Sequence, residues 1–130
     1  HVIISTDKEQ MKAAADSFDF LLDTIPVAHD LNPYLKCLKY DGTHILVGLL
    51  TPIEPALQAG LLVTKRRVVA GSLIGGMPET QEVLDFCAEH DITCDIEMLD
   101  IRNINEAYVR MKKGDVKYRF VIDMKTLKEG

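Results

Sequence analysis

This sequence of 130 residues lacks the features that mark several classes of protein. No apolar run approaches the ~20 residues that a membrane-spanning helix requires, and no signal peptide is visible. The net charge is −5, and apart from Lys65, Arg66 and Arg67 the basic residues are scattered, which argues against a nucleic-acid surface. We therefore expect a cytoplasmic protein that binds neither membranes nor nucleic acids.

The sequence also has few groups that could hold a metal ion or act as a catalytic base. None of its cysteines forms a C-x-x-C pair, and we expect reduced thiols at Cys37, Cys87 and Cys94. Cys94 and His90 alone are weak evidence for a zinc site. No histidine has an obvious carboxylate or nucleophile partner in the sequence, so we expect surface or packing residues at His29, His44 and His90. We predict no catalytic residue and no metal site within this chain.

A glycine-containing segment, residues 71–86, leads from an apolar run into an acidic helix start. Glycines before a helix N-terminus often bind phosphate, but these match neither G-x-G-x-x-G nor G-x-x-x-x-G-K-[ST]. Pro78 lacks an N–H donor, and Glu79 and Glu82 in the first turn would repel an anion. Two interpretations remain open: a plain strand-to-helix turn, or glycines that let the neutral end of a ligand lie close to the backbone.

Apolar runs of strand length alternate with helix patterns in the part of the chain before Cys94. We expect strands at residues 1–5, 18–26, 43–50 and 66–74, and helices at residues 8–17, 30–38, 55–64 and from Pro78 onward. The run 18–26 is apolar on both faces, which is typical of a sheet that is covered on both sides. Residues 39–42 are expected to turn, with Gly42 supplying a positive φ. This alternation predicts an α/β fold with a parallel sheet.

The pattern changes from Cys94 onward, where polar and apolar residues alternate. We expect a strand at residues 94–101, a helix that begins near Asn103 and ends at Gly114, and a final strand at residues 117–124. A polar-alternating tail after a doubly covered sheet indicates that the chain passes from one domain to another. We place that boundary between residues 93 and 94.

Three long segments resemble a known family in order and spacing: residues 23–48, residues 71–92 and residues 104–123. They are similar to the C-terminal part of the cinnamyl alcohol dehydrogenase group of zinc-dependent medium-chain dehydrogenases. The resemblance implies that residues 1–93 are an incomplete NADP-binding Rossmann domain, from its third strand onward. It implies that residues 94–130 return to the catalytic domain. A start at HVIIS without an initiator Met fits a piece of a longer protein.

The family resemblance implies an oxidoreductase that interconverts primary alcohols, allylic, aromatic or aliphatic, and aldehydes by hydride transfer with NADP. The zinc ligands and the glycine fingerprint would lie upstream of His1, so we expect this portion alone to be inactive and to bind no zinc. The residues taken without the family support a different function. They would fit a stand-alone α/β module that binds a nucleotide or a partner and has no chemistry of its own.

The resemblance also implies which residues contact the ligands. Expected cofactor contacts are Thr24 and Ile25 at the ribose and nicotinamide, Val47 and Gly48 at the nicotinamide, Ser72, Leu73 and Ile74 at the carboxamide, and Arg119 at the pyrophosphate. Expected substrate contacts are Leu49, Leu62 and Val63. The glycines near residue 74 would then allow backbone approach to a neutral amide. Leu73 stands where the plant lignin enzymes carry an aromatic residue, which puts a bulky phenylpropanoid substrate in doubt.

The strand at residues 66–74 also predicts an assembly. In the Rossmann strand order 3-2-1-4-5-6 it is the sixth strand and lies at the sheet edge. An edge strand with Val68, Val69 and Leu73 should not face water. We expect a homodimer in which residues 67–74 pair with their own copy. The N-terminal strand, residues 1–5, is the least certain element, because its native neighbours would be missing.

Overall fold

The computed structural model describes residues 1–48 and 52–128. The chain divides into two compact units, His1–Ile74 and Gly75–Gly130. The domain boundary expected between residues 93 and 94 stays a prediction. Among the described residues, no helix is both long enough and apolar enough to cross a membrane.

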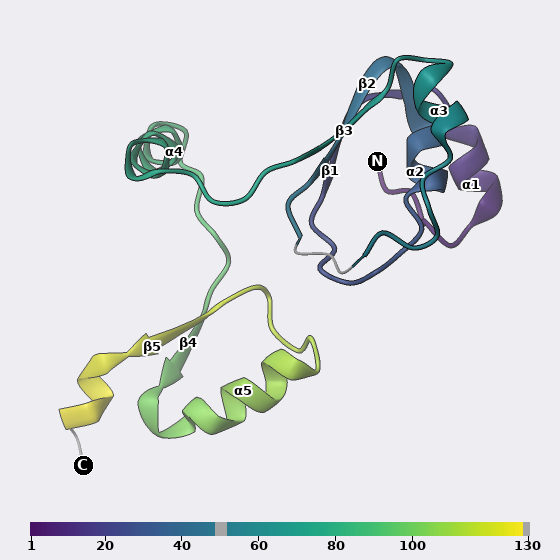
Figure 1. The fold of residues 1–130 in the computed structure, drawn as a ribbon. Helices are drawn as coiled ribbons and strands as arrows, with labels where there is room; N and C mark the ends of the chain where they lie inside the picture. The colour runs from purple at the N-terminus through teal and green to yellow at the C-terminus, as the bar shows by residue number, and fades with distance from the viewer. Residues whose placement is uncertain (49–51, 129–130) are drawn as a thin grey trace. The chain divides into compact units, whose positions relative to one another are not determined.

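The first unit is built on a parallel sheet, which confirms the predicted fold class. Its strands are β1 (Phe18–Asp23), β2 (Leu38–Leu46) and β3 (Val68–Gly71), in the order β1-β2-β3. The helices α1 (Lys8–Ala13), α2 (Asn32–Cys37) and α3 (Ala59–Val63) lie together on one side of it (Figure 1). The core lies between these layers, where Leu31, Leu35 and Leu38 are fully buried. The sheet is therefore covered on one face by this unit.

The second face of the sheet is exposed within the first unit, whereas the sequence predicted a sheet that is covered on both sides. Phe20 and Leu22 alternate with the inward-facing Leu21 and Asp23, and they are 53% and 57% exposed. Their apolar character fits a covered face, but no described element of the first unit packs over them. Apolar residues on both faces thus predicted the strand correctly but not which segment covers it.

The N-terminal residues 1–5 do not form the expected strand. No described strand pairs with them, and the Ile4 N–H instead donates to the Gln10 side chain at 2.9 Å. Asp7 then caps α1 by accepting from the backbone of Glu9 and Gln10. A strand needs a neighbour to satisfy its backbone groups, and a local side-chain bond serves here in its place.

Two further elements differ from the expectation. The turn expected at residues 39–42 is a continuation of β2 with irregular pairing to β1, and Asp41, not Gly42, has the positive φ of 59°. The helix expected at residues 55–64 begins only at Ala59. The side chain of Asn32 holds the preceding segment extended, because it donates to the Ala56 carbonyl and accepts from the Gln58 N–H.

The second unit contains α4 (Met77–Glu89), β4 (Glu97–Asp100), η1 (Ile101–Asn103), α5 (Ile104–Lys112), β5 (Phe120–Asp123) and η2 (Met124–Lys128). Strands β4 and β5 pair in parallel. Gly114 has a φ of 70° just after α5, as expected for a residue that ends a helix. Arg110 ties α5 to β4 through Glu97 at 2.7 Å. Helix α4 begins at Met77, one residue before the expected start at Pro78, and Glu79 accepts from the Gly76 N–H.

Candidate functional site

The carboxyl ends of the three parallel strands meet at one edge of the sheet. Asp23 at the end of β1 is the register partner of Leu46 in β2, and Leu46 is the partner of Gly71 at the end of β3. Ligands of open α/β sheets bind outside such carboxyl ends. The structure thus brings together the turns that hold the predicted cofactor residues Thr24, Ile25, Val47, Gly48, Ser72, Leu73 and Ile74.

Backbone hydrogen bonds order the first residues of these turns. The Asp23 carbonyl accepts from the N–H of Val47 at 2.9 Å and from that of Gly48 at 3.3 Å, and the Leu46 carbonyl accepts from the N–H of Ser72 at 3.0 Å. The turns after β2 and β3 therefore begin as extensions of the strand ladder. The sheet therefore sets the positions of the first residues of these turns.

Gly48 lies against the turn that follows β1. A Cβ at this position would lie 2.4 Å from the Ile25 carbonyl oxygen and 2.7 Å from the Ile25 carbonyl carbon. No side chain fits in that space, so glycine is required here by contact between two backbones. The two turns that hold Ile25 and Gly48 are in direct contact at the carboxyl edge.

A pocket of about 280 Å³ lies at this edge, lined by Leu21, Leu22, Asp23, Thr24, Ile25, Tyr34 and His44. Its lining is mainly apolar. On the turn after β3, Leu73 is 78% and Ile74 87% exposed. The edge therefore presents apolar side chains and ordered backbone, which suits a neutral, flat group better than an anion.

Asp23 joins three donors in a cluster that the sequence did not predict. Its Oδ1 accepts from the Ile25 N–H at 3.0 Å, and its Oδ2 lies 2.9 Å from His29 Nε2 and 3.1 Å from His44 Nε2. The expectation that His29 and His44 lack a carboxylate partner was therefore wrong. The strand register places His44 beside an aspartate that is 21 residues away in the sequence.

The hydrogen bonds define the charge of this cluster. His29 Nδ1 lies 2.8 Å from the Val27 carbonyl, so both ring nitrogens of His29 face acceptors, as in an imidazolium. The bond to Val27 raises the pKa of His29, burial opposes this, and the bond to Asp23 adds to the rise. Burial alone would raise the pKa of Asp23, but the bonds from Ile25, His44 and His29 together hold it below its usual value.

His44 differs from His29, because only one of its ring nitrogens has a hydrogen-bond partner among the described residues. Nε2 donates to Asp23, while Nδ1 is buried and has no hydrogen-bond partner among the described residues. Tyr34 on α2 packs edge-on against both rings, with centroids 5.8 Å from His29 and 6.3 Å from His44. His44 thus has one hydrogen-bond partner in this cluster, whereas His29 has two.

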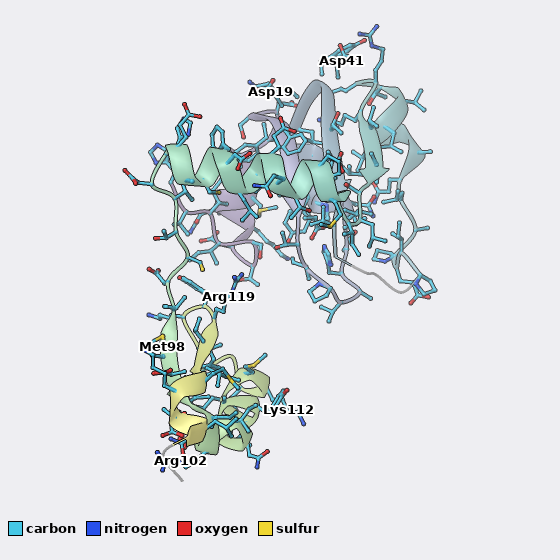
Figure 2. All side chains as sticks on the ribbon, turned by 90° about the vertical axis from the view of Figure 1, so that its left-hand side faces the viewer. Asp19, Asp41, Met98, Arg102, Lys112 and Arg119 are labelled. Carbon is cyan, nitrogen blue, oxygen red and sulfur yellow. The ribbon has the colours of Figure 1, made fainter. Side chains whose placement is uncertain are left out.

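The remaining predicted site residues lie elsewhere. Leu62 and Val63 are on α3, and the Leu62 carbonyl accepts from the Arg67 N–H just before β3, so they lie toward the amino end of that strand. Arg119 precedes β5 in the second unit (Figure 2). Leu49 is outside the described residues. The roles of these four residues stay predictions.

This architecture defines a class, the α/β proteins with a parallel sheet. The family of zinc-binding dehydrogenases matches residues 1–89, and the chain belongs to this family. It is 52% identical to the aldehyde reductase YahK of Escherichia coli over 97% of this chain and 36% of that protein. It is 47% identical to cinnamyl alcohol dehydrogenase 1 of Capsicum annuum over 94% of this chain and 34% of that protein.

Solved structures give the same result. A cinnamyl alcohol dehydrogenase of Sorghum bicolor is similar with a TM-score of 0.84 and 42% identity, over 92% of this chain and 34% of that one. The cinnamyl alcohol dehydrogenase of Helicobacter pylori, solved with NADP(H), has a TM-score of 0.72 and 41% identity, over 88% of this chain and 34% of that one. The resemblance to this group is confirmed. The chain spans about a third of the length of these relatives.

Proposed function

We propose that this chain is the C-terminal portion of a cytoplasmic NADP-dependent alcohol dehydrogenase that interconverts primary alcohols and aldehydes. The bound cofactor would carry the hydride in that reaction, because NADP+ accepts it from the alcohol and NADPH donates it to the aldehyde. The chain's share is to position the nicotinamide side of the cofactor against the carboxyl edge of the sheet. The apolar pocket between Leu21 and His44, next to the ordered turns, is the observation that carries this proposal.

The residues at this edge fit a neutral carboxamide. The backbone groups of Leu73 and Ile74 form no hydrogen bond with the other described residues, and their side chains are exposed. A carboxamide needs one acceptor and one donor, which a single extended segment of backbone provides. Phosphate fits less well, because Glu79 occupies the helix start and bonds to the Gly76 N–H.

We propose that the zinc which the family name implies is not bound by this chain. No group of three or more His, Cys, Asp or Glu residues in the described part of the chain could hold a metal ion. The proposal therefore gives the chain no part in binding zinc, and no step of the function of these residues depends on it.

The test is a chimeric enzyme. The segment of Escherichia coli aldehyde reductase YahK that matches this chain is replaced with residues 1–130, and NADPH-dependent aldehyde reduction is measured beside unmodified YahK. We expect an active enzyme with an NADPH KM within about tenfold of the parent, because the supporting turns are kept. A folded but inactive chimera would favour the alternative, a stand-alone module without chemistry of its own.

We also propose that the chain forms a homodimer through residues 67–74. Strand β3 is at the edge of the three-stranded sheet, and Val68 in it is 47% exposed. Antiparallel pairing of β3 with its own copy would satisfy the free backbone groups of the edge and cover the apolar side chains.

A further inference from the structure

Asp23 connects the two turns that meet at the carboxyl edge. Its backbone carbonyl accepts from Val47 and Gly48 in the turn after β2. Its carboxylate accepts from the Ile25 N–H and from His29, at the two ends of the turn after β1. One residue thus fixes both segments that are proposed to face the nicotinamide.

His29 closes the turn after β1 on itself. It bonds to the carboxylate of Asp23 through Nε2 and to the carbonyl of Val27 through Nδ1. A neutral imidazole has only one N–H, so loss of a proton must break one of these two anchors. Residues 24–28 between them are exposed.

The surroundings stabilise the charged pair. The Asp23 side chain is 7% exposed and that of His29 17%, so water screens the interaction weakly. The other titratable groups that face the pair are His44 on β2, Tyr34 on α2 and Asp30 beside the turn, whose negative charge also favours the protonated form of His29. A buried carboxylate needs such partners to stay ionised.

We propose that Asp23 and His29 are positioning residues that hold residues 24–28 in the conformation that binds the nicotinamide side of NADP(H), and that both His29 anchors of this turn are made only while His29 is protonated. The inference rests on the proposed function. In the proposed role, His29 does not touch the cofactor but acts through Ile25 and its neighbours. Cofactor affinity should therefore fall as the pH rises through the titration of His29.

The first test uses NMR of the ¹⁵N-labelled histidine rings in the whole chain, with no mutation. We expect both His29 nitrogens to be protonated at pH 6.5, and the midpoint of the titration to lie above the ~6.5 of a free histidine. Asp23→Asn should move this midpoint down. A His29 ring that titrates at or below the free value would overturn the proposal.

The second test measures the NADPH affinity of the YahK chimera that carries this chain, between pH 6 and pH 9, by cofactor fluorescence. With the wild-type sequence, loss of one anchor should weaken NADPH binding about fivefold between pH 6 and pH 9. The His29→Gln variant should not show this decrease, because glutamine does not titrate. His90→Gln on α4 is the matched control and should keep the wild-type profile. Identical profiles for wild type and His29→Gln would refute the positioning role and leave the proposed function intact. No NADPH binding at any pH, with the expected His29 titration, would refute the proposed function and the positioning role with it.

Discussion

Replacing Gly48 with alanine is expected to destabilise the first unit through contact between two backbones. The new Cβ would lie 2.4 Å from the Ile25 oxygen, 2.7 Å from the Ile25 carbonyl carbon and 3.1 Å from the Pro26 nitrogen. Backbone atoms cannot rotate away as a side-chain tip can, so the turn after β1 must retreat by about 1 Å to reach an ordinary contact distance.

The cost follows from this displacement. Overpacking of a tight site costs about 1–3 kcal/mol, and weakening the Gly48 and Val47 bonds to the Asp23 carbonyl adds about 1 kcal/mol. In a unit of this size each kcal/mol lowers the melting temperature by about 4–8 °C. We expect a decrease of about 10 °C or more, measured by circular dichroism.

The chain offers a matched control in Gly60→Ala. Apart from its chain neighbours and the backbone of its own helix, no atom of the described residues lies within 4 Å of a Cβ at Gly60 in α3. Alanine there should therefore stabilise the helix by about 1 kcal/mol. The two variants add the same methyl group with opposite expected effects. If Gly48→Ala melts with or above the wild type, the contact with Ile25 is not as the structure describes it.

The remaining predictions concern the cofactor, the core and the assembly. In the complete enzyme, Gly48→Val should raise the NADP KM and lower kcat, since ~1 Å of misplacement can cost ~10²-fold; unchanged kinetics would remove Gly48 from the site. Arg67 is buried and donates to the Leu38 and Leu61 carbonyls, so Arg67→Lys should lower the free energy of unfolding, measured in urea, by about 2–3 kcal/mol. Arg66 is exposed, so Arg66→Lys should leave the urea midpoint nearly unchanged. Equal effects of the two substitutions would contradict this prediction. Val68→Lys should give a monomer by light scattering, and a variant that stays dimeric would exclude β3 as the interface.

The parallel sheet could be predicted from the sequence because its signals are local. Apolar runs such as residues 18–26 are bounded by Pro, Gly or Asp, and the helix patterns between them imply crossover connections. The missing strand at residues 1–5 shows the limit of this reasoning. Apolar composition marks a segment that can pair, but pairing depends on a neighbour that the local pattern does not specify.

The candidate site was predictable to the same extent. Parallel strands put their carboxyl ends together, so the positions of Ile25, Gly48 and Ser72 at one edge followed from the order of elements. The cluster of Asp23, His29 and His44 did not follow, because the register of β1 against β2 is needed to bring Asp23 and His44 together. One signal was available: Asp23 lies within an apolar run, and a carboxylate that is buried in a sheet must find a partner.

The residues at this edge have two different roles: some are proposed to contact the ligand, and others fix the backbone of the segments that would contact it. At Thr24, Ile25 and Leu73 the proposed contacts involve exposed segments in which much of the binding surface is backbone, so several side chains can serve. Asp23 and Gly48 have no such freedom. Only a short carboxylate reaches the Ile25 N–H and His29 together, and only glycine lets the two turns meet. The identity of the supporting side chains therefore constrains this edge of the sheet more strongly than the identity of the exposed ones.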